Sequence, residues 1–154
     1  MGSRHDARRW AVQLLFQTDF NDTPVDDLVA DFWTQEKAPD AVRTFTEELL
    51  HGALAHLDEI DRIVQGLAQN WDLHRMSGVD RNIIRLAMYE MLYRRDIPPV
   101  VSINEAVEIA KEFGGPESGR FVNGILDRAR QDVDRPARTT IDYPGANPAA
   151  QGVD

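Results

Sequence analysis

The chain has 154 residues, 42% of them hydrophobic, which suffices for one domain with a buried core. It contains no cysteine, so disulfides, thiolate zinc sites and cysteine nucleophiles are excluded. No apolar run is long enough to span a bilayer, and the charged N-terminal segment lacks the apolar core of a signal peptide. We therefore expect a cytoplasmic protein without membrane contact.

The formal net charge of −9, taken as a sum, argues against nucleic acid as a partner. The charges are unevenly distributed, however. Residues 22–48 hold eight acids and two bases, whereas residues 75–95 hold five arginines and two acids. Fifteen of the seventeen basic residues are arginine, whose planar side chain suits phosphates and base edges. The pattern is compatible with a basic face on an acidic protein; the alternative is that the arginines are solvated or pair with nearby carboxylates.

Apolar residues recur at helical spacing along most of the chain. Ser3 with Asp6 forms a capping box that predicts a first helix. Thr23 followed by Pro24 predicts a second start, because threonine caps helices and proline fits the first helical position.

A third start is predicted at Pro39 and Asp40. We expect a break at residues 56–58, since one uncapped helix of about thirty residues would be long for a compact domain. Ser77 with Asp80 forms a second capping box and predicts the next helix.

Prolines 98 and 99 must interrupt that helix, because proline lacks a backbone donor and restricts its predecessor. Ser102 with Glu105 is a third capping box. The buried stripe of the helix that it opens is expected to contain Ile103, Ala106, Val107, Ala110 and Phe113. Glycines 114 and 115 should end this helix, and Pro116 should start the last one.

The sequence shows no strand signal and no internal repeat. From residue 134 onward, prolines and small residues occur without periodicity, which is typical of a disordered tail. We therefore predict an all-α fold of about seven helices, with a domain at residues 1–133 and a disordered tail at residues 134–154.

Signals of an enzyme are weak. Residues 114–120 resemble a phosphate loop only in their glycines, because the Gly-Lys-Ser/Thr ending and a preceding strand are absent. His51 and His56 are five residues apart, not the four of a helical metal pair. Glu105 and Glu108 share a helix and could be imagined as a catalytic carboxylate pair. A capping role for Glu105 and a solvent-exposed position for Glu108 explain them better. We expect no catalytic residue, no metal and no cofactor.

The first helix carries residues suited to single-stranded RNA, which is bound through cations for phosphates and aromatic rings for bases. Arg4, Arg8 and Phe16 occur at positions i, i+4 and i+12, and we expect them on one side of the helix. Trp10 is offset toward the apolar stripe and is assigned to the core.

The start of the last helix offers a second RNA platform. Its free backbone amides favour anions, and Ser118 and Arg120 lie close to Phe121 in the sequence. Periodicity alone leaves Phe121 open between stacking and packing, since its spacing to Ile125 also suits the core.

Several blocks occur in a distinctive order. Ile-Asn-Glu-Ala at residues 103–106 and Phe-Val-Asn-Gly at residues 121–124 lie on either side of a Gly-Gly-Pro turn. Asp-Arg-Asn-Ile-Ile-Arg lies upstream at residues 80–85, and the first helix begins with arginines. Together these blocks resemble the NusB family of bacterial transcription antitermination factors, from residue 3 to about residue 131.

The resemblance implies a non-enzymatic protein of two packed three-helix units. Family members pair with NusE, a small-subunit ribosomal protein, and the pair binds the single-stranded boxA element of nascent RNA, most prominently in ribosomal RNA operons. The anchored RNA helps the complex with RNA polymerase to resist termination. By position in the family's motifs, the implied RNA contacts are Arg4, Arg8, Phe16, Glu117, Ser118, Arg120 and Phe121. The implied partner-facing residue is Asp80, which opens a helix and is expected to be exposed.

Other motif residues receive structural roles. We expect Asn104 and Asn123 to make structural hydrogen bonds and Gly124 to allow a close contact between helices. The chain departs from the family at His5 and Asp6, which interrupt the usual basic run and weaken the case for RNA binding by this protein alone, while Arg9 partly offsets the change.

Two other classes of protein stay open. The first is an accessory RNA-binding domain of an RNA cytosine methyltransferase, which resembles this fold, although this chain holds no cofactor-binding α/β region. The second is an all-helical oligomerising protein without an RNA ligand. Self-association as a homodimer, which would mask an RNA face, is also left open by the sequence.

Overall fold

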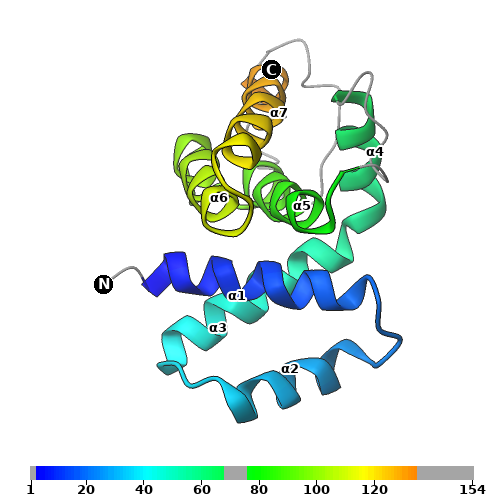
Figure 1. Ribbon diagram of the computed structural model, residues 1–154, viewed down its shortest axis with the longest axis vertical. Coiled ribbons are helices and arrows are strands. Elements are labelled where there is room, and N and C mark those ends of the chain that lie inside the picture. The colour runs from blue at the N-terminus through cyan, green and yellow to red at the C-terminus, as the bar shows by residue number, and fades with distance from the viewer. Residues whose placement is uncertain (1–2, 68–75, 135–154) are drawn as a thin grey trace, which may run out of the picture.

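The computed structural model describes residues 3–67 and 76–134 (Figure 1). Within these ranges the chain is helical without strands, which confirms the expected all-α fold. The helices are α1 (Ser3–Thr18), α2 (Val25–Gln35), α3 (Asp40–Ala55), α4 (Leu57–Leu67), α5 (Gly78–Tyr93), α6 (Pro99–Gly114) and α7 (Pro116–Asp134). The predicted tail lies outside the described residues from position 135 onward, so the domain boundary stays a prediction.

The helices form two groups, as expected. Helices α1, α2 and α3 make one group, and α5, α6 and α7 make the other (Figure 1). α4 continues from α3 and packs along α5 and α7. α1 crosses α3 and also contacts α5, so it joins the two groups.

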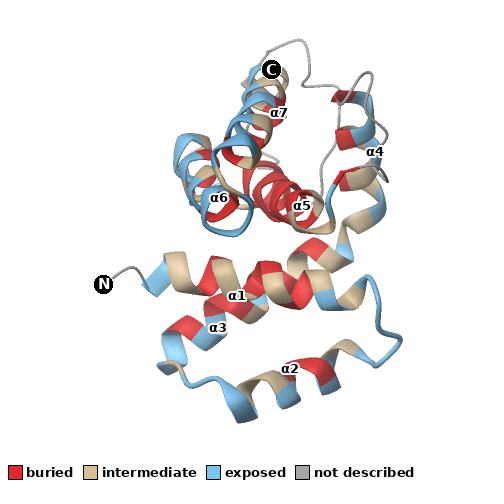
Figure 2. Cartoon of the chain, viewed as in Figure 1, coloured by how far each residue is buried: buried red, intermediate tan, exposed pale blue. Residues whose placement is uncertain are grey.

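α5 is the central helix, and nearly all of its residues from Asp80 to Tyr93 are buried (Figure 2). Glycine is required at position 52 of α3, because a Cβ there would collide with the ring of Tyr89. The core around α5 is aliphatic. Its largest fully buried apolar side chains include Leu14, Leu15, Leu49, Leu50, Ile60, Ile83, Ile84, Met88, Ile109 and Leu126.

α2 is attached to α1 by aromatic side chains. Trp10 of α1 packs edge to face against Trp33, with ring centroids 5.6 Å apart, and against Phe32 at 6.3 Å. The indole Nε1 of Trp33 donates to Glu47 of α3 at 2.9 Å. Trp10 is half-buried against the core, in line with its assignment from the sequence.

The helix breaks in the first half of the chain follow the local signals with one shift. α3 ends at Ala55 and α4 begins at Leu57, so the expected break near His56 is confirmed. The predicted cap at Thr23 is wrong, because the N-cap of α2 is Pro24 and no side chain caps it. The backbone amide of Thr23 instead donates to Asn21 Oδ1 at 2.9 Å, which closes a turn before the helix begins.

In the second half, the cap at Ser77 is confirmed: its hydroxyl accepts from the backbone amide of Asp80 at 3.0 Å. The prediction of a capping box at Ser102 is wrong. α6 already begins at Pro99, and the Ser102 hydroxyl donates to Glu90 Oε1 inside the fold at 2.7 Å. A serine followed by a glutamate three residues later therefore marks a buried polar contact here and not a helix start.

Candidate nucleic-acid interface

One side of α1 faces the core and carries Arg8. This residue is only 4% exposed, and its Nε and Nη2 donate to the two oxygens of Glu90 at 2.8 and 3.0 Å. Glu90 is 1% exposed and also accepts from Ser102. The structure thus buries Arg8 against a carboxylate that joins α1 to α5, and contact of Arg8 with RNA stays a prediction.

Arg4 lies one turn earlier and is exposed. Its guanidinium carbon lies 4.3 Å from the ring centroid of Phe45 in α3. At about 100° per residue, Phe16 is rotated by about 120° from Arg4, so these two residues do not share a side of the helix. The structure accordingly places Arg4 against α3 and Phe16 against the start of α5.

Arg9 lies on the other side of α1, next to the end of α6. Its guanidinium carbon is 6.0 Å from the ring centroid of Phe113, and its Nε is 3.5 Å from Glu112 without a hydrogen bond. Phe113 was expected in the buried stripe of its helix, but the ring is 39% exposed. That prediction is wrong, because Phe113 lies in the last turn of α6, where its side chain is only partly covered and has Arg9 beside it.

His5 ties the same side of α1 to α6. Its Nδ1 lies 2.8 Å from Glu105 Oε1 and its Nε2 lies 3.2 Å from Glu112 Oε1. Burial lowers the pKa of the His5 imidazole, but hydrogen bonds to both glutamates and their negative charges outweigh it, so the net pKa is raised above its usual value.

The turn between α6 and α7 agrees with the sequence. α6 ends at Gly114, Gly115 has a φ of 86°, and Pro116 is the first residue of α7. Gly114 must lack a side chain, since a Cβ there would collide with Ser118. The turn thus brings the first residues of α7 close against the end of α6.

The predicted residues of this turn lie together. Glu117 and Arg120 are exposed in the first turns of α7, whereas Phe121 is half-buried and packs against the core. The Ser118 hydroxyl donates to Asp80 Oδ2 at 3.4 Å, which joins the turn to the start of α5. Stacking of RNA on Phe121 stays a prediction.

Asp80 was expected to be exposed, and that expectation is wrong. The residue is 9% exposed, because Ser118 of α7 covers its carboxylate. Burial raises the pKa of the Asp80 carboxyl above its usual value, and hydrogen bonds with Ser118 and Ser77 only partly offset this effect. Its charge is thus weakly compensated within the described part of the chain.

The polar residues that follow Asp80 hold the end of α1. Asp19 accepts from Asn82 at 2.8 Å, from Arg85 at 3.1 Å and from Arg81 at 3.2 Å. Burial raises the pKa of Asp19, but these hydrogen bonds and the charge of Arg85 outweigh it and hold the pKa below its usual value. Arg85 also donates twice to Asp61 of α4, at 2.8 Å each. The Asp-Arg-Asn-Ile-Ile-Arg block is therefore mainly structural.

Two phenylalanines complete this end of α1. Phe16 is half-buried over Gly78, where a Cβ would lie 2.7 Å from its ring. It packs edge to face against Phe20 with centroids 5.0 Å apart, and Phe20 is 72% exposed.

Side-chain contacts connect these residues into one region. They run from Arg9 through Phe113 and the α6–α7 turn to Ser118, and from Asp80 at the start of α5 to Phe16. We call it the α1–α7 surface, comprising Arg9, Phe16, Phe20, Phe113, Glu117, Ser118 and Arg120. Sequence reasoning missed Phe20 and Phe113 and undervalued Arg9. A signal existed for Arg9, because it precedes Phe16 by seven residues, or about 20° around a helix.

The remaining motif residues do not have the roles expected of them. Asn104 and Asn123 are exposed and make no side-chain hydrogen bond among residues 3–67 and 76–134. Gly124 is exposed, and a Cβ there would meet nothing within 4 Å. These predictions of hydrogen bonding and close helix contact are wrong, because all three residues lie on the outer faces of α6 and α7.

In the part of the chain that the structure describes, no cluster of histidine and carboxylate side chains could hold a metal ion. None of the helices described is long and apolar enough to cross a membrane.

The fold and this surface define a helical binding protein whose exposed arginine and aromatic side chains suit nucleic acid. The NusB family model matches residues 5–131. The transcription antitermination protein NusB of Myxococcus xanthus is 43% identical, across 88% of this chain and 100% of its own. The chain belongs to the NusB family. Its curated relatives are transcription antitermination proteins, a class without enzymatic activity, so the expectation that the chain is no enzyme is confirmed.

Solved structures agree. NusB of T. maritima is 33% identical with a TM-score of 0.77, covering 90% of this chain and 97% of its own. A complex of the antitermination factors NusB and NusE with double-stranded RNA contains a chain that is 25% identical with a TM-score of 0.75. That match covers 85% of this chain and 98% of the other.

Proposed function

We propose that this protein and NusE together bind the single-stranded boxA element of nascent ribosomal transcripts in the cytoplasm. The bound RNA would be held near RNA polymerase and would help the antitermination complex to form. The protein's membership of the NusB family supports this function, as does the solved complex of a related NusB with NusE and RNA.

The α1–α7 surface is the observation that carries the proposal. Single-stranded RNA is recognised by stacking of unpaired bases on aromatic rings and by cations that meet the phosphates. Phe113 and Phe20 are exposed rings at its two ends, and Arg9 and Arg120 supply cations. Arg9 is suited to meet a phosphate, because its side chain is partly exposed and its ion pairs with Asp6 and Glu112 are near the surface.

The acidic balance of the chain explains why a partner would be needed. With a net charge of −9, the protein as a whole repels a polyanion. NusE would add basic surface next to the RNA. By its position in the family's motif Asp80 faces this partner, and a basic side chain that displaces Ser118 from its carboxylate would supply the missing positive charge.

The function is tested by measuring binding of a boxA RNA oligonucleotide to the protein with and without NusE, using fluorescence anisotropy at several salt concentrations. We expect weak binding by the protein alone and much tighter binding by the pair, with affinity falling as salt rises. Equal binding of boxA and a scrambled RNA by the pair would contradict the sequence preference. No binding by the pair would contradict the function.

The partner contact is tested with Asp80→Asn, which keeps the shape of the side chain and removes its charge. Affinity for NusE should fall while the fold is retained. The matched control is Asp58→Asn, another acid in the first turn of a helix, exposed on α4. Equal loss of NusE affinity in both variants would indicate a general charge effect and remove Asp80 from the interface.

A further inference from the structure

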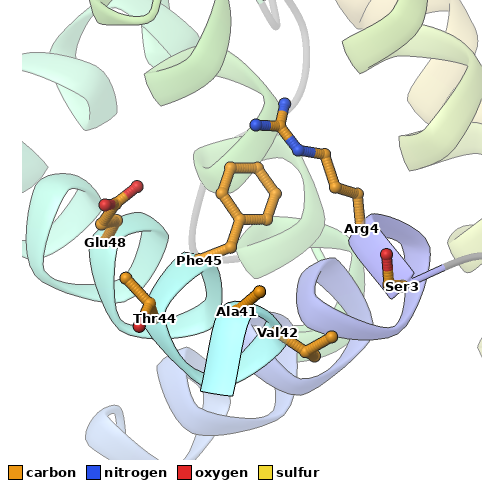
Figure 3. A pocket seen from close by; sticks show the side chains of 7 residues that line it. All are labelled: Ser3, Arg4, Ala41, Val42, Thr44, Phe45 and Glu48. Carbon is orange, nitrogen blue, oxygen red and sulfur yellow. The ribbon is translucent and has the colours of Figure 1, made fainter. Parts of the chain in front are cut away.

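A cleft between the start of α1 and the first half of α3 is separate from the α1–α7 surface. It has a volume of about 370 Å³ and is lined by Ser3, Arg4, Ala41, Val42, Thr44, Phe45 and Glu48. Figure 3 shows Arg4 and Ser3 on one wall and the α3 side chains on the other. The volume lies at the small end of the range of about 300–1,000 Å³ typical of small-molecule sites, so one nucleotide unit fits it better than a folded partner.

Three arginines surround the ring of Phe45, and only one of them is available to a ligand. Arg8 and Arg94 have guanidinium carbons 5.5 Å from the ring centroid, but the first is bound to Glu90 and the second to Asp96 and Glu48. Arg4 lies closest, at 4.3 Å, and is in no ion pair with the residues that the structure describes. Arg4 packs on the Phe45 ring and lines the cleft together with it.

The chemistry of the walls matches a nucleobase. The guanidinium plane of arginine stacks on bases, and the apolar part of the wall, from Ala41, Val42 and Phe45, suits a flat ring. Glu48 is exposed at the rim; Arg94 lies 3.4 Å from its Oε1, and its Oε2 is an acceptor that favours a base with an exocyclic amino group. The same negative charge disfavours a phosphate at that end of the cleft.

We propose that this cleft binds a single amino-bearing nucleobase, cytosine in the simplest case, stacked on Arg4 with its amino group donating to Glu48. The base can belong to RNA that continues beyond the α1–α7 surface or to a free nucleotide. Only the first source rests on the proposed function.

The first test is a titration of the full-length protein with cytidine and uridine monophosphates, followed by the backbone amide NMR signals of Thr44, Phe45 and Glu48. We expect cytidine monophosphate to shift these signals at roughly ten-fold lower concentration than uridine monophosphate, the discrimination that one hydrogen-bonded base edge provides. Glu48→Ala should remove this preference. Absence of shifts at these three amides with either nucleotide and with RNA would overturn the proposal.

The second test separates stacking from charge. Arg4→Ala and Arg4→Lys should both weaken cytidine binding by about ten-fold or more, because lysine keeps the charge but lacks the planar group. Arg95→Ala is the control, since Arg95 is equally basic, exposed and outside the cleft. If Arg4→Lys binds cytidine as the parent does, the contact is electrostatic and the proposal is overturned.

The third test uses the complex with NusE and a boxA RNA extended by cytidines. Shifts at the α3 amides identify RNA as the source of the base. If the RNA binds without those shifts while cytidine monophosphate causes them, the source is a free nucleotide and the base site stands. If the RNA does not bind but cytidine monophosphate does, the proposed function fails and the cleft is retained.

Discussion

Arg8 and Arg9 are neighbours with the same chemistry, yet they do opposite things in the structure. Arg8 is buried and bound by both of its partner's oxygens, whereas Arg9 is at the surface beside the exposed ring of Phe113. One residue along a helix is a rotation of about 100°, which is enough to move a side chain from the core to solvent. A sequence with an arginine-rich helix can thus be assigned to its protein family without knowing which arginine is available to a ligand.

The physical difference lies in the partners. A buried guanidinium loses its hydration and is tolerated only with a well-aligned, fully hydrogen-bonded carboxylate, which Glu90 provides with help from Ser102. Arg9 pairs with Glu112 at 3.5 Å and Asp6 at 3.7 Å near solvent, where such pairs stabilise little. Arg8 therefore fixes α1 against α5, whereas the ion pairs of Arg9 hold no helix in place as firmly.

Arg8→Ala should have the largest effect on stability. It would leave the Glu90 carboxylate buried without its cation, so we expect the free energy of unfolding to fall by about 3–5 kcal/mol. Urea denaturation followed by circular dichroism measures the change. The control is Arg9→Ala, for which we expect a loss within about 1 kcal/mol.

A rescue variant sharpens this test. In Arg8→Ala/Glu90→Gln, the buried charge is removed together with its partner, so the loss should be smaller than in Arg8→Ala alone. Equal instability of the single and double variants would show that lost packing, not the unpaired charge, accounts for the effect.

Much of the fold was predictable because its signals are local. The break at His56, the cap at Ser77 and the end of α6 at Gly114 depend on residues within one turn of the chain. Ser102 was misassigned because its partner Glu90 lies twelve residues away on another helix. A capping pattern cannot be distinguished by spacing from a serine that makes a long-range buried contact.

The surroundings of the candidate site residues were harder to predict than the helices that carry them. Exposure of Phe113 and burial of Asp80 both depend on which neighbouring helix covers them, and periodicity within one helix does not contain that information. Asp80 opens a helix, as expected, but the turn before α7 brings Ser118 onto its carboxylate.

The role of the surface around Arg9 is tested with Phe113→Ala. If the ring is a stacking platform, the affinity of the protein–NusE pair for boxA RNA should fall by about 1–3 kcal/mol. Thermal stability should barely change, because the ring is substantially exposed. Val101→Ala, an exposed apolar residue near the other end of α6, serves as the control for RNA titration and melting. A large drop in melting temperature with unchanged RNA affinity would assign Phe113 to packing.

The smallest expected effect is the pH dependence of the contact between α1 and α6. The pKa of His5 is raised in the folded protein above its usual value of 6.5, so protonation favours folding. The groups that face it are Glu105 and Glu112, which are themselves near Arg8 and Arg9. The stabilisation by His5 is therefore fully present below pH 6.5 and is lost as the pH rises through the raised pKa.

His5→Gln removes this titration. Because the pair is partly exposed, we expect the variant to be less stable than the parent by at most about 1 kcal/mol at pH 6, with the contribution of protonation absent at pH 9. Urea denaturation of both proteins at pH 6, 7.5 and 9 measures the difference. A difference that stays constant across this range would mean that His5 acts through packing or neutral hydrogen bonds. A difference that grows with pH would mean that the unfolded chain binds the proton on His5 more tightly than the folded protein does. That result would contradict an ion pair between His5 and α6.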